Sequence, residues 1–276
     1  MSKTKDINCF WFSGPLGDVE HVCLLSMLKQ DHKVRLFCYE ALANVPAGIE
    51  IVDAREILPR DEFIFHNESG SPALGSNRLR YRIMKMGLGL WFDTDVILIK
   101  PIDLDDDYIF GWQDDVSING AVLFLPKTAD VTEEIYNFVE QKFPVPPFYD
   151  PATRTELERR AMLGDPIGVE DLPWGVHGPD TLTYFIQKNN LQRFAKPREV
   201  FYPLHWSEAH ALLTAEYDVS SCITESTIAV HLWNFALRLP SRLRPDNPVG
   251  SLIVEKNSFV EKFAREQLGV KMRELL

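Results

Sequence analysis

The chain has 276 residues, with 29 lysine and arginine residues against 40 aspartate and glutamate residues, so its formal net charge is −11. This acidic balance excludes a dedicated nucleic-acid-binding protein, because affinity for the phosphate backbone depends on clustered cations. Hydrophobic residues make up 45% of the sequence and charged residues 25%, a composition that is typical of globular proteins and excludes a disordered chain. We expect a single domain over residues 1–276 that does not bind nucleic acid.

The sequence also predicts the compartment. Its four cysteines form no C-x-x-C pair and have apolar neighbours, which favours free thiols in a reducing compartment. The apolar run at 9–12 ends at Ser13, Gly14 and Pro15, so it is too short to be the apolar region of a signal peptide. No segment approaches the roughly 20 apolar residues that a membrane span needs. We therefore expect a cytoplasmic protein without stable membrane insertion.

The first hundred residues follow the pattern of an α/β nucleotide-binding layout. Apolar runs predict strands at 7–12, 33–39 and 49–53, and a first helix is predicted from Asp18, which is placed to cap it. A second helix is predicted from Ser76 and ends at residues 87–89. Ligands of such folds bind beyond the carboxyl ends of the strands, so residues 1–100 are expected to be the nucleotide-binding half.

The remaining residues predict further strands and helices around one unusual segment. Residues 90–99 are nearly all apolar except for Asp93 and Asp95, which predicts one strand buried on both faces. A proline-rich and polar stretch predicts a surface insertion near 144–175, a common place for substrate-specific elements. The other predicted elements are a charged loop at 105–107, strands at 121–125 and 228–234, and helices near 131–143, 179–187 and 258–268.

The motif Asp93-Thr94-Asp95 is the sharpest chemical feature of the sequence. On a strand, its two carboxylates would point to the same side, about 6.6 Å apart along the chain. Two anions among apolar neighbours are costly to bury unless a cation neutralises them, and carboxylate oxygens suit Mg²⁺ or Mn²⁺. The alternative is that the strand ends at Asp93 and both acids lie in a solvated loop; the bare D-x-D tripeptide favours this alternative.

The residues around the motif form a more specific pattern. They resemble the D-x-D region of the family-32-like glycosyltransferases, which include initiation-specific mannosyltransferases and lactosylceramide α-1,4-galactosyltransferases. The family pattern reads S-D-x-x-R-Y, a short helix, G-G-x-[YW]-x-D-x-D-x and K-P-[IL]. The matching segments are S-N-R-L-R-Y at 76–81, G-L-G-L-W-F-D-T-D-V at 87–96 and K-P-I at 100–102. Weaker matches at 11, 119–121, 178–183 and 230–233 extend the resemblance over most of the chain.

The resemblance implies a function and a set of site residues. It implies a GT-A fold, a Rossmann-like mixed α/β sheet flanked by helices, and metal-dependent transfer of a sugar from a nucleotide-sugar donor to a glycan or glycolipid acceptor, with retention of anomeric configuration. A UDP-sugar is the first choice of donor and GDP-mannose the second, and Mn²⁺ or Mg²⁺ is the implied metal. The implied catalytic residues are Asn77, Arg80, Asp93 and Asp95, and the implied metal ligands are Asp93, Asp95 and His231. The implied donor-binding residues are Trp11, Ser76, Arg80, Asp93 and Thr94. The implied acceptor-side residues are Gly178, Asp180 and Trp233, which belong to an acceptor-side half over residues 101–276.

Most of these residues also have a structural interpretation. His231 on an apolar strand and Trp11 in the first strand fit the core, and Arg80 fits an exposed helix cation. Pro179 fits the first position of an ordinary helix. Asn77 stands where the family pattern has an aspartate, so the choice of donor sugar and the activity itself depend on whether an amide, which both donates and accepts hydrogen bonds, serves there.

Two other functions fit parts of the sequence. An apolar strand followed by D-x-D-V also resembles the start of haloacid-dehalogenase-like phosphatases, in which the first aspartate is the nucleophile and the second a general acid. Against this, three predicted strands precede the motif, and Ile97 stands where threonine or valine is usual. The second alternative is a catalytically decayed protein that binds sugar nucleotides, which Asn77 favours.

Overall fold

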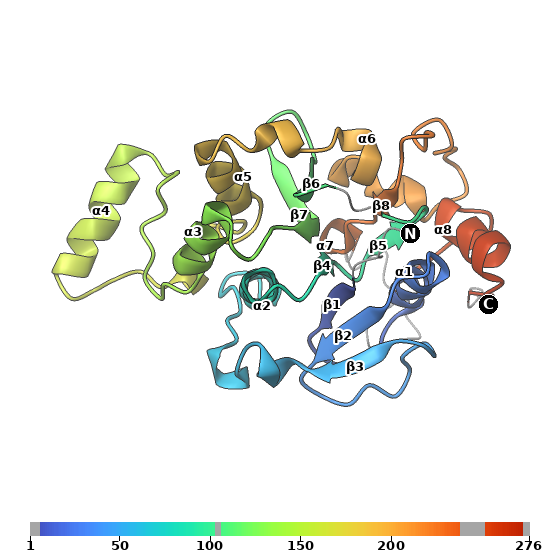
Figure 1. Ribbon diagram of the computed structural model, residues 1–276, viewed down its shortest axis with the longest axis horizontal. Helices are drawn as coiled ribbons and strands as arrows, with labels where there is room; N and C mark the ends of the chain where they lie inside the picture. Colours follow the sequence, from blue (N-terminus) through green and yellow to red (C-terminus); the bar gives the residue numbers. More distant parts are fainter. Residues whose placement is uncertain (1–5, 103–105, 238–251, 273–276) are drawn as a thin grey trace.

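A six-stranded mixed sheet forms the centre of the computed structural model, which describes residues 6–102, 106–237 and 252–272 (Figure 1). The strand order is β3-β2-β1-β4-β7-β6, in which β7 runs antiparallel to both of its neighbours and the first four strands are mutually parallel. A second, two-stranded sheet pairs β5 with β8. The strands are β1 Ile7–Trp11, β2 Val34–Cys38, β3 Glu50–Asp53, β4 Leu90–Phe92, β5 Val96–Leu98, β6 Ile109–Trp112, β7 Ile118–Phe124 and β8 Ala229–His231. The predicted fold class, an α/β mixed sheet flanked by helices, is confirmed.

Helices cover both faces of the sheet (Figure 1). On one face α1 packs against β5 and the π-helical turn Phe263–Leu268 that follows α8; on the other, α2 packs against β4 and α3, and α5 against β7. The helices are α1 Asp18–Lys29, α2 Ala73–Met86, α3 Asp130–Val139, α4 Pro151–Met162, α5 Pro179–Lys188, α6 Arg198–Phe201, α7 Asn234–Leu237 and α8 Phe259–Lys262. Within the described segments, no helix is both long enough and apolar enough to span a lipid bilayer.

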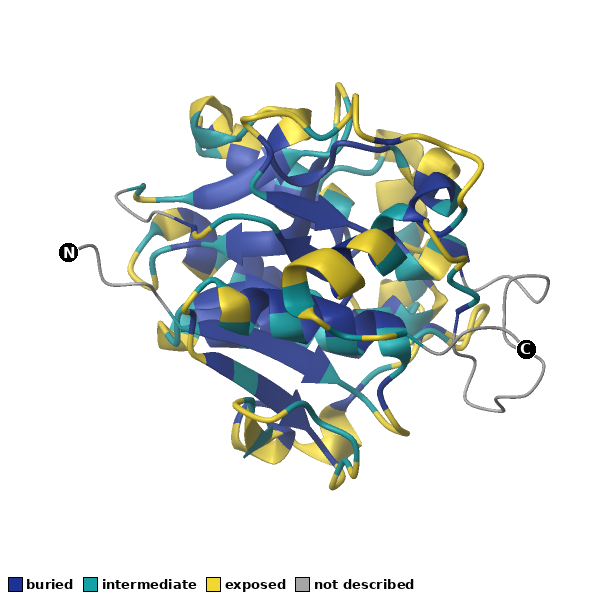
Figure 2. Cartoon of the chain, turned by 90° about the vertical axis from the view of Figure 1, so that its right-hand side faces the viewer, coloured by how far each residue is buried: buried dark blue, intermediate teal, exposed yellow. Residues whose placement is uncertain are grey.

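Alternate side chains of the central strands enter two separate cores. Leu90 and Phe92 of β4 belong to the core that α1 covers, whereas Trp91 between them belongs to the core beneath α2, α3 and α5. This alternation follows from the period of two of a β-strand. The buried strands therefore lie in the interior, and exposed residues lie on the outer sides of the helices and loops around them (Figure 2).

The prediction of one continuous strand at 90–99 was wrong. The strand β4 ends at Phe92, and β5 begins at Val96 in the other sheet. The Asp93 amide still donates to the Ala121 carbonyl of β7 at 2.9 Å, and the Val96 amide donates to the Asp93 carbonyl at 3.3 Å. The D-x-D motif is therefore a turn between the two sheets, so the strand spacing of its carboxylates does not apply.

Several smaller predictions also differ from the structure. The α2 helix begins at Ala73, so Ser76 lies inside it, and α1 is capped by Gly17, so Asp18 lies in the first turn. The β6 strand was not predicted because it contains Gly111, a residue that weakens strands; a side chain there would meet the Phe201 ring. The insertion contains the helix α4, none of whose residues is buried. Residue 105 of the predicted charged loop lies outside the described residues.

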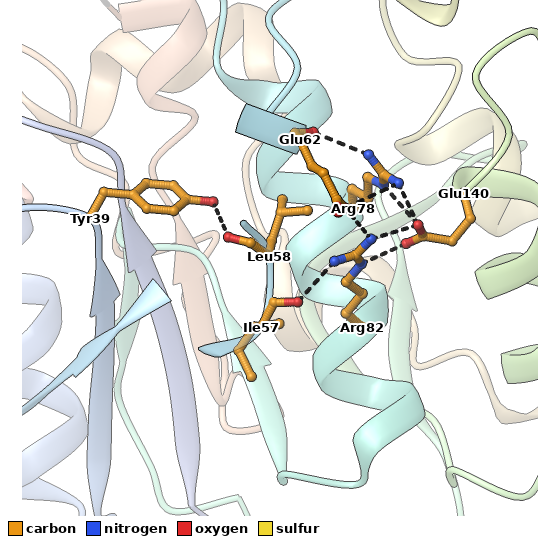
Figure 3. Close-up of polar contacts among 7 residues, drawn as sticks. All are labelled: Tyr39, Ile57, Leu58, Glu62, Arg78, Arg82 and Glu140. Atoms are coloured by element: carbon orange, nitrogen blue, oxygen red, sulfur yellow. Dashed lines mark hydrogen bonds and ion pairs between the residues drawn. The ribbon is translucent and has the colours of Figure 1, made fainter. Parts of the chain in front are cut away.

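An ion-pair network of Arg78, Arg82, Glu62 and Glu140 connects α2 to the end of α3 (Figure 3). The carboxylate of Glu140, directly after α3, accepts hydrogen bonds from Arg78 and Arg82 of α2. The two arginines continue to the backbone, because Arg82 donates to the Ile57 carbonyl at 3.0 Å and Arg78 to the Glu62 carbonyl at 3.1 Å. Since α2 also carries Asn77 and Arg80, the network fixes the helix that presents two of the predicted site residues.

Candidate metal and ligand-binding site

Asp93, Asp95 and His231 lie together where the chain passes from one sheet to the other. One ligand atom of each residue lies within 4.8 Å of the other two, so the three residues form a group that can hold a metal ion. The two aspartates belong to the turn between β4 and β5, and the antiparallel pairing of β5 with β8 places His231 opposite Val96. Strand pairing thus brings a distant histidine beside the D-x-D turn. We refer to these three residues as the acidic cluster.

The carboxylate of Asp95 is buried and well bound. His231 Nε2 lies 3.3 Å from its Oδ2, and the backbone N–H of Asn234 donates to the same oxygen at 2.7 Å. Burial by itself would raise the pKa of Asp95, but the charge and hydrogen bond of His231 and the Asn234 amide together lower it. Asp95 is therefore an anion at neutral pH, the form that binds cations.

An unusual backbone conformation at Trp233 allows the bond from Asn234. Its φ is 59°, in the left-handed region that bulky residues rarely adopt, and it turns the chain immediately after β8. Two contacts hold Trp233 there: its indole N–H donates to the Leu204 carbonyl at 3.0 Å, and its ring centroid lies 4.2 Å from that of His231. Strain of this kind is characteristic of sites where geometry serves a function.

Asn234 links the acidic cluster to a buried carboxylate on α1. Its Nδ2 donates to Glu20 Oε1 at 2.7 Å, and Glu20 is 1% exposed. Sequence analysis missed both residues. The available signal for Glu20 was its position between Val19 and Val22 on the apolar face of α1, where a carboxylate needs a specific partner.

Two donors hold Asp93 in place. Arg80 Nη2 lies 2.7 Å and Trp91 Nε1 lies 2.6 Å from Asp93 Oδ1, and the guanidinium also lies over the Trp91 ring. Arg80 is buried, so the interpretation as an exposed helix cation is wrong. Its guanidinium is engaged by Asp93, which makes Arg80 a positioning residue for that carboxylate.

Glycines provide the space for these side chains. A Cβ atom at Gly120 would lie 2.6 Å from Arg80 Nη1, so a larger residue on β7 would displace the guanidinium. A Cβ atom at Gly178, the N-cap of α5, would lie 3.4 Å from Asn77 Nδ2. The predicted residue Gly178 therefore lies against the amide that replaces the aspartate of the family pattern.

Two cavities meet at the acidic cluster and share Asn77, Arg80, Asp93, Asp95 and Asn234 in their walls. The first, of about 590 Å³, lies beyond the carboxyl end of β1; we call it the β1 cavity, and its further walls include Phe10, Trp11, Phe12, Phe65 and Trp91. The second, of about 430 Å³, lies beside the start of α5; we call it the α5 cavity, and its further walls include Trp174, Gly178, Trp206, His231, Trp233 and Phe235. Both volumes are in the range of small-molecule sites.

The predicted donor-binding residues lie on the β1 cavity. Trp11, Ser76 and Thr94 belong to its wall, and the Trp11 indole N–H donates to the Gly14 carbonyl at 2.9 Å. Asn77 lies on both cavities, and within the described part of the chain its side-chain amide makes no hydrogen bond, which leaves it available to a ligand.

The predicted acceptor-side residues divide into two groups. Gly178 and Trp233 line the α5 cavity, but Asp180 is exposed and does not belong to its wall. The reason is the rotation of α5: Thr181 and Leu182 point into the protein, with Thr181 bonded to the Val176 carbonyl, so Asp180 is turned towards solvent. Its carboxylate nevertheless lies near Gly175, which belongs to that wall, so a contact between Asp180 and the acceptor stays a prediction.

Comparison with known proteins finds no matching family model and no matching curated protein. Among solved structures, the chain is similar to "PaToxG Glycosyltransferase", with a TM-score of 0.43 and 11% identity over 68% of this chain and 70% of that chain. It is also similar to the apo-form glycosyltransferase GlyE of Streptococcus pneumoniae TIGR4, with a TM-score of 0.34 and 11% identity over 89% of this chain and 57% of that chain. The chain thus spans little more than half the length of GlyE.

Proposed function

We propose that the protein is a metal-dependent, retaining glycosyltransferase that transfers a sugar from a nucleotide-sugar donor to a glycan or glycolipid acceptor. The observation that carries this proposal is the acidic cluster at the junction of two cavities. Two carboxylates and an imidazole are donors that suit Mn²⁺ or Mg²⁺, and a divalent cation there offsets the negative charge that an anionic donor meets. When bound, the ion supplies Lewis-acid stabilisation of the departing diphosphate.

We assign the donor to the β1 cavity. The cavity lies at the carboxyl ends of parallel strands, where α/β proteins bind nucleotides, and aromatic side chains from β1 and from Phe65 offer faces on which a base can stack. The resemblance of residues 76–102 to the glycosyltransferase pattern favours a UDP-sugar, with GDP-mannose as the second choice. The diphosphate then reaches the acidic cluster, and the acceptor enters through the α5 cavity.

The surrounding side chains orient the reacting groups. Arg80 and Trp91 both donate to Oδ1 of Asp93, which holds that carboxylate in one orientation. Asn77 lies on both cavities, so its amide is placed to hydrogen-bond hydroxyl groups of the transferred sugar. Buried donors and acceptors that are already oriented lose little free energy in reorganisation when charge develops at the anomeric carbon.

The same contacts argue against the phosphatase alternative. Arg80 and Trp91 both donate to Oδ1 of Asp93, so only Oδ2 of this residue could serve as the nucleophile of a phosphatase. A general acid at Asp95 needs a raised pKa, whereas His231 and Asn234 lower the pKa of this residue.

Thermal unfolding in the presence of ligands tests the proposal. The protein is heated with UDP, GDP and their sugars, each with Mn²⁺ and again with EDTA. A ligand at 100 times its dissociation constant adds about 2.7 kcal/mol to the free energy of unfolding. We expect a rise in Tm with one nucleotide that requires Mn²⁺ and disappears in Asp95→Asn, while Glu156→Gln on the exposed helix α4 serves as the matched control.

Activity is measured on the same samples as Mn²⁺-dependent hydrolysis or transfer of the sugar. The proposal is refuted if no nucleotide raises Tm, or if the rise is the same with EDTA and in Asp95→Asn. Nucleotide binding without any turnover of a nucleotide sugar would instead identify a decayed enzyme.

A further inference from the structure

We propose that Trp174 and Phe235 form a stacking platform for a pyranose ring at the mouth of the α5 cavity, so that the acceptor is a neutral glycoside. This inference rests on the proposed function, because it takes the β1 cavity as the donor site. It adds the chemical class of the acceptor and the residues that select it.

The two rings stack on each other and are exposed at the mouth of the α5 cavity. Their centroids lie 4.9 Å apart with an angle of 21° between the ring planes, and Trp174 is 45% and Phe235 61% exposed. The rings come from distant parts of the sequence, one from the turn before α5 and the other from α7. Exposed, contiguous aromatic surface is unfavourable in water and marks binding sites in soluble proteins.

Exposed aromatic residues are concentrated at the two cavities. Six phenylalanine, tryptophan or tyrosine side chains are exposed in the described part of the chain, and four of them line a cavity: Phe65, Trp174, Trp206 and Phe235. The remaining two are Phe143 and Tyr217. Exposure by chance does not favour two cavities in this way, so the aromatic surface belongs to the ligand site.

The backbone under both rings is firmly held. Next to Trp174, the Gly178 amide donates to the Gly175 carbonyl at 2.7 Å and the Val176 amide donates to the Pro173 carbonyl. Next to Phe235, the Ala236 amide donates to the Trp233 carbonyl at 2.8 Å. A rigid aromatic surface loses little conformational entropy when a ligand binds, which is an advantage for a weakly binding sugar ring.

The chemistry of a pyranose matches the two ends of the cavity. Such a ring presents C–H groups on its faces, which pack against aromatic rings, and hydroxyl groups at its edge, which need hydrogen bonds. The platform supplies the first at the mouth, and polar side chains in the wall of the same cavity, among them Gln113 and Asn119, supply the second. The formal net charge of −11 disfavours an anionic acceptor.

Saturation-transfer difference NMR on the whole chain with UDP and Mg²⁺, which unlike Mn²⁺ is diamagnetic, tests the platform. The probes are methyl β-D-galactopyranoside, methyl α-D-glucopyranoside and methyl α-D-mannopyranoside, with N-acetyl-tyrosinamide and N-acetyl-serinamide as peptide-like competitors. We expect at least one glycoside to bind, with saturation greatest on the C–H protons of one ring face. Trp174→Ala and Phe235→Ala should each weaken its binding about fivefold, whereas Trp174→Phe and the control Phe143→Ala should retain it.

The platform is refuted if the two alanine variants bind the glycoside as tightly as the unaltered chain, or if the amino-acid amides bind and no glycoside does. Thermal shifts by UDP and Mg²⁺ in the same samples separate this failure from failure of the proposed function. If UDP still raises Tm but the alanine variants bind the glycoside as tightly as the unaltered chain, only the platform is overturned. Platform-dependent glycoside binding without a nucleotide shift supports the platform and overturns the transferase.

Discussion

Replacing Glu140 with glutamine tests how strongly the network in Figure 3 fixes the site helix α2. Glu140 has a 21% exposed side chain and accepts hydrogen bonds from both Arg78 and Arg82. Burial by itself would raise the pKa of Glu140, but the hydrogen bonds and charges of the two arginines outweigh it and lower the pKa from 4.5 to about 2. At about 1.4 kcal/mol per pKa unit, this difference corresponds to about 3 kcal/mol of unfolding free energy at pH 7.

The sign of the pH dependence follows from the lowered pKa. The stabilisation is fully present above pH 4.5, the ordinary value, and is lost as the pH falls through about 2, because the folded protein then binds the same proton as the unfolded chain. The difference between the unaltered chain and Glu140→Gln should therefore be about 3 kcal/mol at pH 7 and less than half of that at pH 3.

Urea unfolding followed by circular dichroism at pH 7, 5 and 3 measures this difference. Glu156→Gln is the control, because its partner Arg159 lies on the same exposed helix and such surface pairs contribute less than about 1 kcal/mol. If Glu140→Gln costs no more than the control at pH 7, or costs the same at pH 7 and pH 3, the assignment of this stability to the ionised carboxylate is wrong.

Substitutions of Gly89, Gly120 and Glu20 have defined outcomes, two of them with a matched control variant. Gly89→Ala should destabilise the protein by about 2 kcal/mol or more in urea unfolding. The reason is that φ of Gly89 is +119° and the new Cβ would lie 2.4 Å from the Asp6 carbonyl oxygen. Gly164→Ala, the control with a positive φ and open space around it, should lower the free energy of unfolding clearly less. Gly120→Ala should weaken Mn²⁺ binding in calorimetry about tenfold by displacing Arg80 from Asp93, and unchanged affinity would show that Arg80 does not position that carboxylate. Glu20→Ala should also weaken Mn²⁺ binding, whereas Glu20→Gln, which keeps an oxygen for Asn234 Nδ2, should retain most of it; equal losses would disprove the proposed link through Asn234.

The sequence predicted most of the α/β fold because its apolar periodicity is strong. Strands β1, β2 and β3 and helices α1 and α5 lie close to their expected positions, since each combines an apolar pattern with a nearby turn or helix-start signal. The prediction from periodicity was wrong for the segment 90–99. Its two apolar runs have the same composition as one buried strand, and the turn at 93–95 depends on pairing with β7 and β8, which are distant in the sequence.

The candidate site was predictable only where a local sequence motif marks its residues. Asp93, Asp95 and His231 were nominated by motif and resemblance, and the structure brings them together. Asn234 and Glu20 were not nominated, because a buried glutamate on a helix and an asparagine after a strand have no distinctive local pattern. The aromatic platform was also missed, since Trp174 and Phe235 become neighbours through the tertiary structure alone.

The pairing of β5 with β8 also has a consequence during protein synthesis. All six strands of the central sheet are encoded before residue 125, whereas His231 leaves the ribosome much later. Because chains fold progressively as they emerge, the sheet can form while the third member of the acidic cluster is still being made. A chain terminated between β7 and β8 lacks His231 and should therefore bind a divalent cation more weakly than the full chain, so the proposed ion site is completed only late in synthesis.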